Sequence, residues 1–293
     1  MLNNVLIIGS NGFVGKNIKP YLDNIDNISV KTSSHQVGKA DFCINPQNVV
    51  KSASIIKKFD VIIFCPAYFS DSKESRAINY EFPLNFFKLA NTVGVKKFIF
   101  LSTTLVAKEM TQSEIDKIVF QDSYVEQYPK YKAKAEISLN QINGPTNLII
   151  LRLSHIYNNE ITSFKGIFRF ILKLQKLKFL ILPNIKVKKS LLHIDNLKKL
   201  LLKIIYSHNI SGTYYVNDGV YYDLIDISRY IAKCNGNSKI YHFRISTKLF
   251  RFFSLFFISK YPQLKFYARD LMFSSKKTQD TFKWNPEAEI INK

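Results

Sequence analysis

A glycine-rich turn near the start of the chain constrains the fold more than any other feature. The apolar run Val5–Ile8 ends at Gly9, and Gly9, Gly12 and Gly15 follow with the spacing G-x-x-G-x-x-G before helix-like spacing over Val14–Leu22. In a strand–turn–helix unit, the first glycine permits the turn, the second lets backbone N–H groups approach a pyrophosphate, and the third lets helix and strand pack closely. The segment predicts a dinucleotide-binding turn, with an ordinary strand–helix turn as the alternative.

Apolar runs alternate with helix-like segments over the first half of the chain. Asp60–Cys65, Lys97–Leu101 and Asn147–Arg152 are nearly continuous runs, typical of strands buried on both faces of a parallel sheet, and Glu81–Val93 has helical periodicity. This order predicts an α/β fold with a Rossmann-type doubly wound parallel sheet. The alternation weakens later, so we expect a dinucleotide-binding domain over 1–155 and a smaller, mainly substrate-binding C-terminal lobe over 156–293.

The net charge of +20 is unevenly distributed. Residues 1–150 hold 17 basic and 13 acidic side chains, whereas residues 151–293 hold 25 and 9. An excess of this size suggests an anionic partner, such as nucleic acid, a membrane surface or a phosphorylated substrate, although a bias toward Lys in the composition is an alternative. No run interleaves basic and aromatic residues in an RNA-binding pattern, so we expect no nucleic acid partner.

Two segments of the basic half are amphipathic or apolar. Phe164–Leu182 gathers its basic residues on one helical face, and Leu249–Ile258 is apolar between flanking lysines. Both could rest on an anionic membrane surface, or their apolar faces could belong to the core of the substrate lobe.

Targeting and disulfide signals are absent from the sequence. The three cysteines form no Cys-x-x-Cys pair, so we expect neither a disulfide framework nor a metal site. No signal peptide precedes the first apolar run, and no uncharged apolar stretch reaches the roughly 18–20 residues that span a bilayer. We therefore expect a cytoplasmic protein, which could lie peripherally at the inner face of the membrane.

Candidate cofactor contacts follow the first three expected strands. Those in the glycine turn are Gly9, Asn11, Gly12, Phe13, Val14 and Gly15. An NAD site usually has an acid after the second strand, and the stretch from Lys31 to His35 contains none. Lys31 and Ser33 could receive a 2′-phosphate, so NADP(H) is favoured over NAD(H), and a solvated loop is the alternative. Asp41 and Phe42, at the expected end of the third strand, could contact adenine.

Tyr128 and Lys132 lie four residues apart, which places them on one face of a helix. A lysine there can lower the pKa of the tyrosine, so that the phenol moves a proton near neutral pH. Chance also produces such pairs in a chain rich in both residues. The pair follows a strand that ends at Thr103, however, and a hydroxyl at that strand end could bond the same substrate oxygen.

With these residues in place, the chain resembles the extended short-chain dehydrogenase/reductases, specifically the NAD-dependent epimerase/dehydratase family of nucleotide-sugar enzymes. The matching segments, in family order, are GSNGFVG, DVIIFCPA, NYEFPLNFF, KKFIFLSTT, YPKYKAKAE, LRLSHIY, KKSLLHIDNL and FKWNP. The resemblance implies that Tyr128 is the acid/base, Lys132 its partner and a cofactor contact, and Thr103 the hydroxyl of the triad. It further implies that Ala67 contacts the cofactor and that Asn79 braces the active-site strands.

The chain departs from the family pattern after Thr103. Dehydratases of the family have an Asp-Glu pair there, whereas this chain has Thr104 and Leu105. A leucine cannot move a proton, so we expect no 4,6-dehydration. Once dehydration is excluded, the reactions that the resemblance implies are hydride transfers at sugar C4, either a 4-epimerisation or a 4-keto reduction.

The C-terminal motifs look most like a subgroup that acts on UDP-N-acetylhexosamines in surface-polysaccharide biosynthesis. Lys189 stands where the family has an Arg that contacts the diphosphate, and it keeps the charge without the bidentate fork. His155 replaces an Asn, and Tyr157–Asn159 replaces Tyr-Gly-Pro, so the geometry of the substrate loop differs and the sugar stays open. Thr104, His155 and Lys189 are the expected substrate contacts.

Together these features predict an NAD(P)-dependent nucleotide-sugar oxidoreductase acting at C4, which binds a nucleotide-diphosphate sugar and forms a homodimer. The alternative from another class is a non-catalytic Rossmann-fold scaffold that binds RNA or a membrane partner through its basic surface. Thr103, Tyr128 and Lys132 favour the enzyme, because a scaffold has no need of that constellation.

Overall fold

The computed structural model describes most of the 293 residues, and these are 2–70, 72–107, 127–160, 168–169, 171–172, 181–236, 241–246, 248–250, 252, 256 and 270–292. The chain divides into two compact units. The first consists of Met1–Ser154, Lys198–Val216 and Asp280–Trp284, and the second of His155–Leu197, Asn217–Gln279 and Asn285–Lys293. The expected assignment of cofactor binding to 1–155 and substrate binding to 156–293 stays a prediction.

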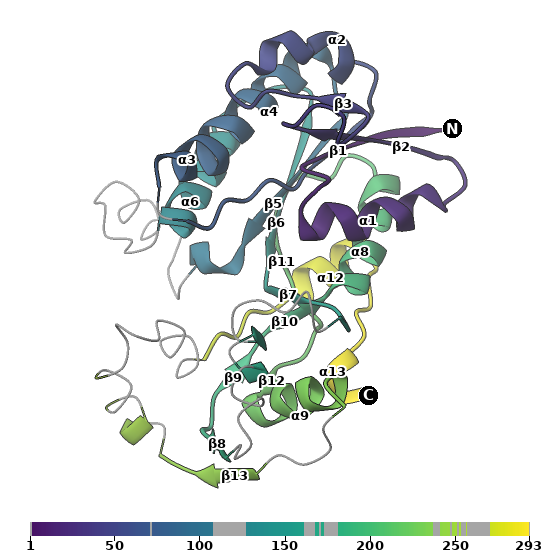
Figure 1. Cartoon of the computed structure of the whole chain (residues 1–293). Coiled ribbons are helices and arrows are strands. Elements are labelled where there is room, and N and C mark those ends of the chain that lie inside the picture. The colour runs from purple at the N-terminus through teal and green to yellow at the C-terminus, as the bar shows by residue number, and fades with distance from the viewer. Residues whose placement is uncertain are drawn as a thin grey trace. The chain divides into compact units, whose positions relative to one another are not determined.

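A parallel sheet forms the centre of the first unit (Figure 1). Its strands are β1 (Asn3–Ile8), β2 (Ile28–Ser34), β3 (Phe42–Cys43), β4 (Val61–Phe64), β5 (Lys97–Thr103), β6 (Asn147–Leu153) and β11 (Gly212–Val216). They lie in the order β11-β6-β5-β4-β1-β2-β3, and all neighbours pair in parallel. The strand order reverses between β1 and β4, as it does in a doubly wound sheet, so the expected fold class is confirmed.

Helical segments lie between these strands in the chain or follow them. They are α1 (Phe13–Asp23), η1 (Val49–Ser52), α2 (Ala53–Ile56), α3 (Lys73–Arg76), η2 (Ala77–Glu81), α4 (Phe82–Val93), η3 (Thr104–Ala107), α6 (Gln127–Asn140), α8 (Ile194–Tyr206) and α12 (Lys276–Phe282). Leu6 of β1 and Phe98 of β5 belong to one buried cluster with Phe86 of α4 and Leu139 of α6. Figure 1 shows α2, α4 and α6 on one side of the sheet and α1 on the other. Helices on both faces explain why the central strands are almost wholly apolar.

The described residues of the second unit form three two-stranded sheets. β7 (His155–Tyr157) pairs in parallel with β10 (Leu191–His193), and β8 (Ile181–Asn184) pairs in parallel with β13 (Tyr241–Arg244). β9 (Lys188–Lys189) is antiparallel to β12 (Tyr222–Asp223). Helix α9 (Leu224–Cys234) begins at a capping box formed by Asp223 and Asp226, and α13 (Glu289–Asn292) is the last helix of the described chain.

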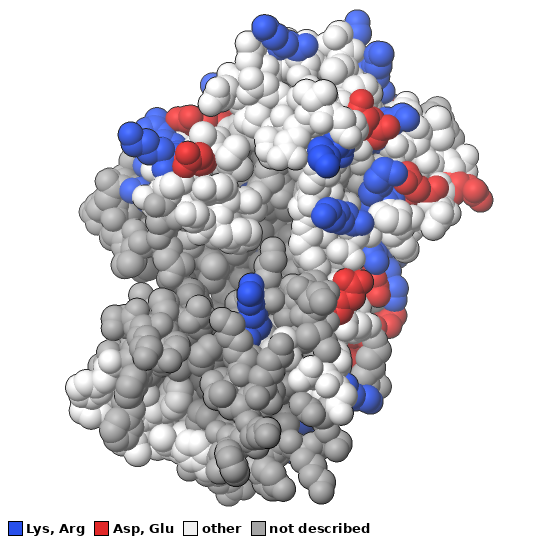
Figure 2. All heavy atoms as spheres, viewed as in Figure 1, with Lys and Arg blue, Asp and Glu red and all other residues white. Residues whose placement is uncertain are grey.

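The two segments considered for membrane contact lie largely outside the described residues. Within Phe164–Leu182, residues 181 and 182 belong to strand β8, so the expected helix is wrong at its end. Only four residues of Leu249–Ile258 are described. In the described part of the chain, no helix has the length and apolar character needed to cross a bilayer. On the face drawn in Figure 2, the described Lys and Arg side chains are scattered among Asp and Glu.

The third glycine of the turn holds α1 against the strand that precedes it. A Cβ at Gly15 would lie 2.6 Å from Ser10 Cα and 2.7 Å from the Gly9 carbonyl oxygen, and both of these atoms are backbone. A Cβ at Gly12 would come no closer than 3.4 Å to that oxygen, and Gly12 has φ −75° and ψ 168°, which any residue adopts. A methyl group should therefore lower the free energy of unfolding more at Gly15 than at Gly12.

We expect Gly15→Ala to lower the free energy of unfolding by about 3 kcal/mol, because backbone atoms must move to admit the methyl group. Gly12→Ala is the matched control and should cost less than about 1 kcal/mol. Urea denaturation followed by circular dichroism measures both. Equal stabilities of the two variants would contradict the close packing of α1 on β1.

Candidate functional site

The glycine turn leaves the first turn of α1 open to an anion. Gly9 has φ +78°, a conformation that glycine adopts without strain. Gly12 caps the helix without a side-chain hydrogen bond, and Phe13 and Val14 begin a first turn that contains no acidic residue. Backbone N–H groups at such a helix start attract phosphate. The cofactor contacts expected in this turn thus lie together in the first unit.

Polar side chains at the end of β2 lie beside the turn. Asn11 Nδ2 donates to Ser34 Oγ over 3.0 Å. Ser33 is only 1% exposed, and in the described part of the chain its buried hydroxyl has no hydrogen-bond partner. Because buried hydroxyls are normally paired, this one is suited to a ligand group. A glycine cradle and an unpaired hydroxyl both fit a dinucleotide.

Asp41, which lies outside β2 in the sequence, places its carboxylate against this strand. The sequence of β2 alone contains no acidic residue and does not predict this contact. Asp41 Oδ2 accepts hydrogen bonds from the backbone N–H of Thr32 (2.9 Å) and from its hydroxyl (2.7 Å), and Lys31 Nζ lies 3.3 Å from Oδ1. Although burial acts in the opposite direction, the hydrogen bonds from Thr32 and the charge of Lys31 hold the pKa of Asp41 below its usual value. Lys31 is therefore already paired with an anion.

The two remaining cofactor candidates have different surroundings. Phe42 in β3 packs edge-on against Phe59, with ring centroids 6.1 Å apart. Ala67 is exposed in the segment after β4. That segment is held by Asn79, whose Nδ2 donates to the Tyr68 carbonyl over 2.7 Å while its Oδ1 accepts from the Tyr68 N–H over 3.0 Å. Asn79 thus fixes the backbone next to Phe69.

Tyr128 and Thr103 meet at the start of α6. The two side chains are hydrogen-bonded, and the ring of Phe69 lies against that of Tyr128 with centroids 4.5 Å apart. Burial raises the pKa of Tyr128 well above its usual value, and the hydrogen bond with Thr103 lowers it again in part. Sequence reasoning missed Phe69, because an aromatic residue in a loop carries no periodic signal.

Lys132 lies one turn further along α6 and is fully buried. Its Nζ donates to the carbonyl oxygens of Pro66 (3.0 Å) and Leu101 (2.9 Å), and it lies 4.5 Å from the ring centroid of Phe100. Burial lowers the pKa of Lys132 to about 7, against the opposing charges of Cys65 and Glu136. The lysine therefore joins the ends of β4 and β5 to the helix of Tyr128. That it lowers the pKa of Tyr128 stays a prediction.

Thr104 follows Thr103 directly and is buried at 5% exposure in the first residue of η3. The N–H of Leu105 donates to Thr103 Oγ1 over 3.2 Å, so the turn after β5 fixes the hydroxyl. Leu105 thus supplies a backbone contact and no proton-transferring group at this strand end.

Glu136, one helical turn after Lys132 on α6, forms a buried ion pair with Arg152. The sequence analysis did not predict this pair. Arg152 of β6 donates from Nε (2.9 Å) and from a terminal nitrogen (2.6 Å) to one carboxylate oxygen of Glu136, and Ser102 donates to the other. Arg152 also donates to the Tyr215 hydroxyl over 3.0 Å. The sequence does contain one indication of a role for Glu136: it follows Lys132 by four residues, so both lie on one face of the helix.

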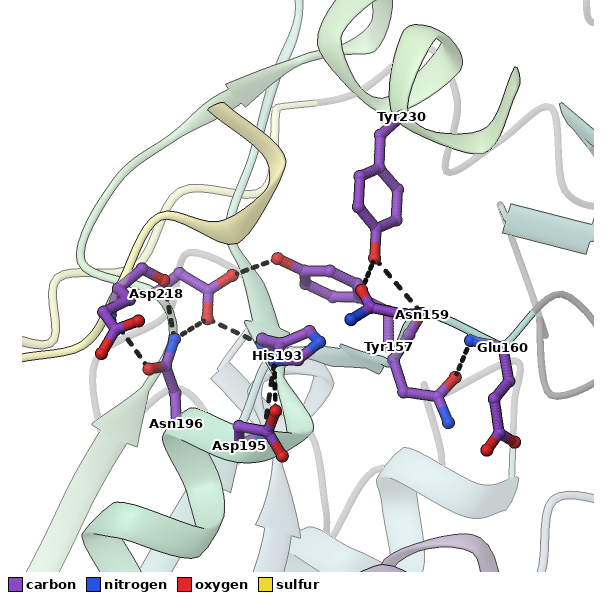
Figure 3. A network of polar contacts seen from close by, with 10 residues as sticks. Tyr157, Asn159, Glu160, His193, Asp195, Asn196, Asp218 and Tyr230 are labelled. Atoms are coloured by element: carbon purple, nitrogen blue, oxygen red, sulfur yellow. Dashed lines mark hydrogen bonds and ion pairs between the residues drawn. The ribbon is translucent and has the colours of Figure 1, made fainter. Parts of the chain in front are cut away.

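In the second unit, a buried carboxylate gathers four hydrogen bonds, and Figure 3 shows those from Tyr157, His193 and Asn196. Asp218 Oδ1 accepts from the His193 N–H and from Asn196 Nδ2, both over 2.7 Å, and Oδ2 accepts from the hydroxyls of Tyr157 (2.8 Å) and Tyr222 (3.0 Å). Burial raises the pKa of Asp218 to about 6 although these donors act in the opposite direction. The network fixes β7, β10 and β12 to one another.

The substrate candidates of the second unit lie near this network. His155 begins β7, opposite Leu191 in β10, and its ring stacks on Phe168 with centroids 5.4 Å apart. Lys189 in β9 is only 3% exposed and bridges Leu271 through its backbone. Thr103, Tyr128 and Lys132 are brought together in the first unit, whereas the roles of His155 and Lys189 stay predictions.

The sequence of the chain matches the model of one protein family and the sequence of a curated relative. The model of the NAD dependent epimerase/dehydratase family matches residues 5–216. The chain is 28% identical over 239 residues to the UDP-glucose 4-epimerase of Vibrio cholerae, which covers 75% of this chain and 72% of that protein.

Solved structures share the fold at lower identity. The UDP-N-acetylglucosamine 4-epimerase from Bacillus cereus is similar with a TM-score of 0.73 and 14% identity, over 99% of this chain and 93% of that one. The dTDP-4-dehydrorhamnose reductase from Bacillus anthracis, solved in complex with NADP, has a TM-score of 0.63 and 17% identity, over 84% and 85%.

The raised pKa of Asp218 predicts a pH-dependent stability. The carboxyl titrates near 3.8 in an unfolded chain and near 6 in the folded one, so the folded state holds a proton that the unfolded state has lost between these values. Stability should therefore fall as pH rises through this window, by about 3 kcal/mol relative to Asp218→Asn. Urea unfolding at several pH values measures the difference. Asp280→Asn, at an exposed acid, is the control, and parallel curves for Asp218→Asn and wild type would contradict the prediction.

Proposed function

The chain belongs to the NAD dependent epimerase/dehydratase family, and from this membership we propose that it is an oxidoreductase that acts at C4 of a nucleotide sugar. The observation that carries the proposal is the group at the ends of β4 and β5. There Tyr128 is hydrogen-bonded with Thr103, and Lys132 is anchored to the Pro66 and Leu101 carbonyls. This group lies in the unit that contains the glycine turn.

In the proposed reaction, Tyr128 accepts or returns the proton of the C4 hydroxyl. Thr103 Oγ1 orients the oxygen, and its own position is set by the Leu105 N–H. Lys132 lies one helical turn from the phenol, and we expect its positive charge to oppose the rise in pKa that burial causes in Tyr128. A bound nicotinamide would supply the acceptor or donor of the hydride. The ring of Phe69 lies against the ring of Tyr128.

The cofactor of this proposal would lie on the glycine turn. Gly9, Gly12 and the open start of α1 would receive the pyrophosphate, and the buried hydroxyl of Ser33 would find its missing partner there. Asp41 influences the choice between NAD(H) and NADP(H). The carboxylate of Asp41, held by the Thr32 N–H, favours a ribose 2′-OH, whereas the positive charge of Lys31 favours a 2′-phosphate. We propose that this pair sets the preference, and that the preference expected from Lys31 alone is weakened.

The proposed substrate is a UDP-N-acetylhexosamine or a related nucleotide-diphosphate sugar of surface-polysaccharide biosynthesis. Both the curated relative and the Bacillus cereus structure are described as 4-epimerases of UDP sugars. A reductase of a 4-keto sugar is the second candidate, and the Bacillus anthracis relative is described as such an enzyme. Leu105 in the position of an acid supports the absence of dehydration.

Replacing the phenol tests the proposed acid/base. Tyr128→Phe should lower kcat by a factor of about 10²–10⁴, because the ring stays but no group moves the C4 proton. Folding and NAD(P) binding should persist, which circular dichroism and fluorescence titration check. Tyr131→Phe, on the same helix, is the matched control. Full activity of Tyr128→Phe would favour the non-catalytic scaffold.

Product analysis separates the two candidate reactions. The epimerase should convert UDP-GlcNAc without added reductant, whereas the reductase should consume NAD(P)H only with a 4-keto-6-deoxy sugar. Turnover with neither substrate would contradict the proposed function.

Asp41→Asn tests the cofactor choice in the same assays. Without the carboxylate, the ratio of the Kd for NADP⁺ to that for NAD⁺ should fall by about tenfold, because a repulsive charge near the 2′-phosphate is gone. An unchanged ratio would show that Asp41 does not face the ribose.

A further inference from the structure

The ion pair of Glu136 and Arg152 occupies a place where a charge is costly. Their side chains are 4% and 9% exposed, and both lie within the parallel-sheet unit. Replacing such a pair by apolar groups is often neutral or stabilising in proteins, so stability alone is a weak reason for its presence. The position of the carboxylate offers a better reason, because Glu136 lies one helical turn from Lys132 and two from Tyr128.

The contacts of Glu136 leave its carboxylate well fixed. Arg152 donates two hydrogen bonds to Oε2, and Ser102 donates to Oε1. Arg152 is held in turn by the Tyr215 hydroxyl at 3.0 Å and by the face of the same ring, 5.4 Å from the guanidinium carbon. The pair is therefore anchored on β5, β6 and β11, and it cannot turn away from the helix.

The carboxylate of Glu136 is one of the groups that favour a charged Lys132. Within the described part of the chain, the hydrogen bonds of Lys132 go to backbone carbonyls, which solvate an ammonium group but carry no net charge. Burial disfavours the charged form, and Glu136 and Cys65 are the groups whose charges favour it. Among the described residues, further titratable or charged side chains near this part of α6 include Tyr128, Lys130 and Lys134 on the same helix, Arg152 on β6 and Tyr215 on β11. The thiol of Cys65 has a pKa raised by burial to about 12, so it is neutral near pH 7.

We infer that Glu136, held by Arg152, is a positioning residue of the reaction centre, whose buried carboxylate keeps the ammonium group of Lys132 charged beside Tyr128. The catalytic meaning of this inference rests on the proposed function. The control of the charge on Lys132 by Glu136 is a property of the folded chain and can be measured without any substrate.

The test compares Glu136→Gln, which keeps shape and removes charge, with Glu136→Asp, which keeps charge. NMR of protein labelled at the lysine ε-carbons follows the titration of Lys132, and its signal is assigned by its loss in Lys132→Met. This assignment separates it from Lys97, whose pKa is also lowered by burial, to about 8. Tyr215→Phe is the control, since it disturbs the packing of the pair and changes no charge.

In Glu136→Gln, the titration midpoint of Lys132 should move to lower pH by about one unit, because a negative charge that favours the ammonium form is gone. Glu136→Asp should restore most of the shift, and Tyr215→Phe should leave the midpoint in place. Above the midpoint, one unit means about ten times less charged lysine, so kcat of Glu136→Gln should fall by about tenfold at alkaline pH, with a smaller change in KM.

A single substitution that leaves Arg152 buried and unpaired could prevent folding. Glu136→Gln combined with Arg152→Gln removes both charges, and the Lys132 midpoint should again fall, but by less than in Glu136→Gln, because the positive charge of Arg152 is lost as well. A folded variant of either kind that titrates like the wild type would overturn the inference and leave the pair a structural one. A midpoint that moves in a protein that converts no nucleotide sugar would overturn the proposed function, while the control of Lys132 by Glu136 would stand.

Discussion

The site depends on one geometric constraint, which is that all strands of the seven-stranded sheet run in the same direction. Parallel strands bring their carboxyl ends to one edge, so the turns after β1, β4 and β5 meet there although the sequence separates them widely. Gly9 follows β1, Pro66 follows β4, and Thr103 ends β5. Helix α6 then adds Tyr128 and Lys132 from a later part of the chain. A sheet of mixed direction would divide these groups between two edges.

Burial shifts the pKa values of the ionisable groups in the site, and it also makes their charged forms unfavourable in free energy. Lys132 has no exposure, and the environment that brings its pKa toward 7 also destabilises its charge. The carbonyls of Pro66 and Leu101 and the carboxylate of Glu136 offset that cost. In the second unit, Asp218 pays a similar desolvation penalty, which four donors oppose. Each unit thus contains a buried charge whose neighbours decide how it titrates.

The basic surplus that the composition shows has no single explanation in the structure. Lys97, Lys132, Arg152 and Lys189 are buried, so part of the positive charge is internal. Lys31 and Lys19 are paired with acids on the same unit. These residues show that a net charge read from composition is a poor guide to a surface, because it does not say which side chains reach solvent.

Much of this protein followed from its sequence. The apolar runs, the glycine spacing and the Tyr128–Lys132 interval determined the central strands, the turn and one helical face, because each of these depends on residues close together in the chain. The tertiary structure alone decided what depends on distant segments. It brought Asp41 to Thr32, Arg152 to Glu136, and Asp218 to Tyr157 and His193. No local pattern records these pairs, since they form only when strands from separate parts of the chain pack side by side and exclude water from the charges between them.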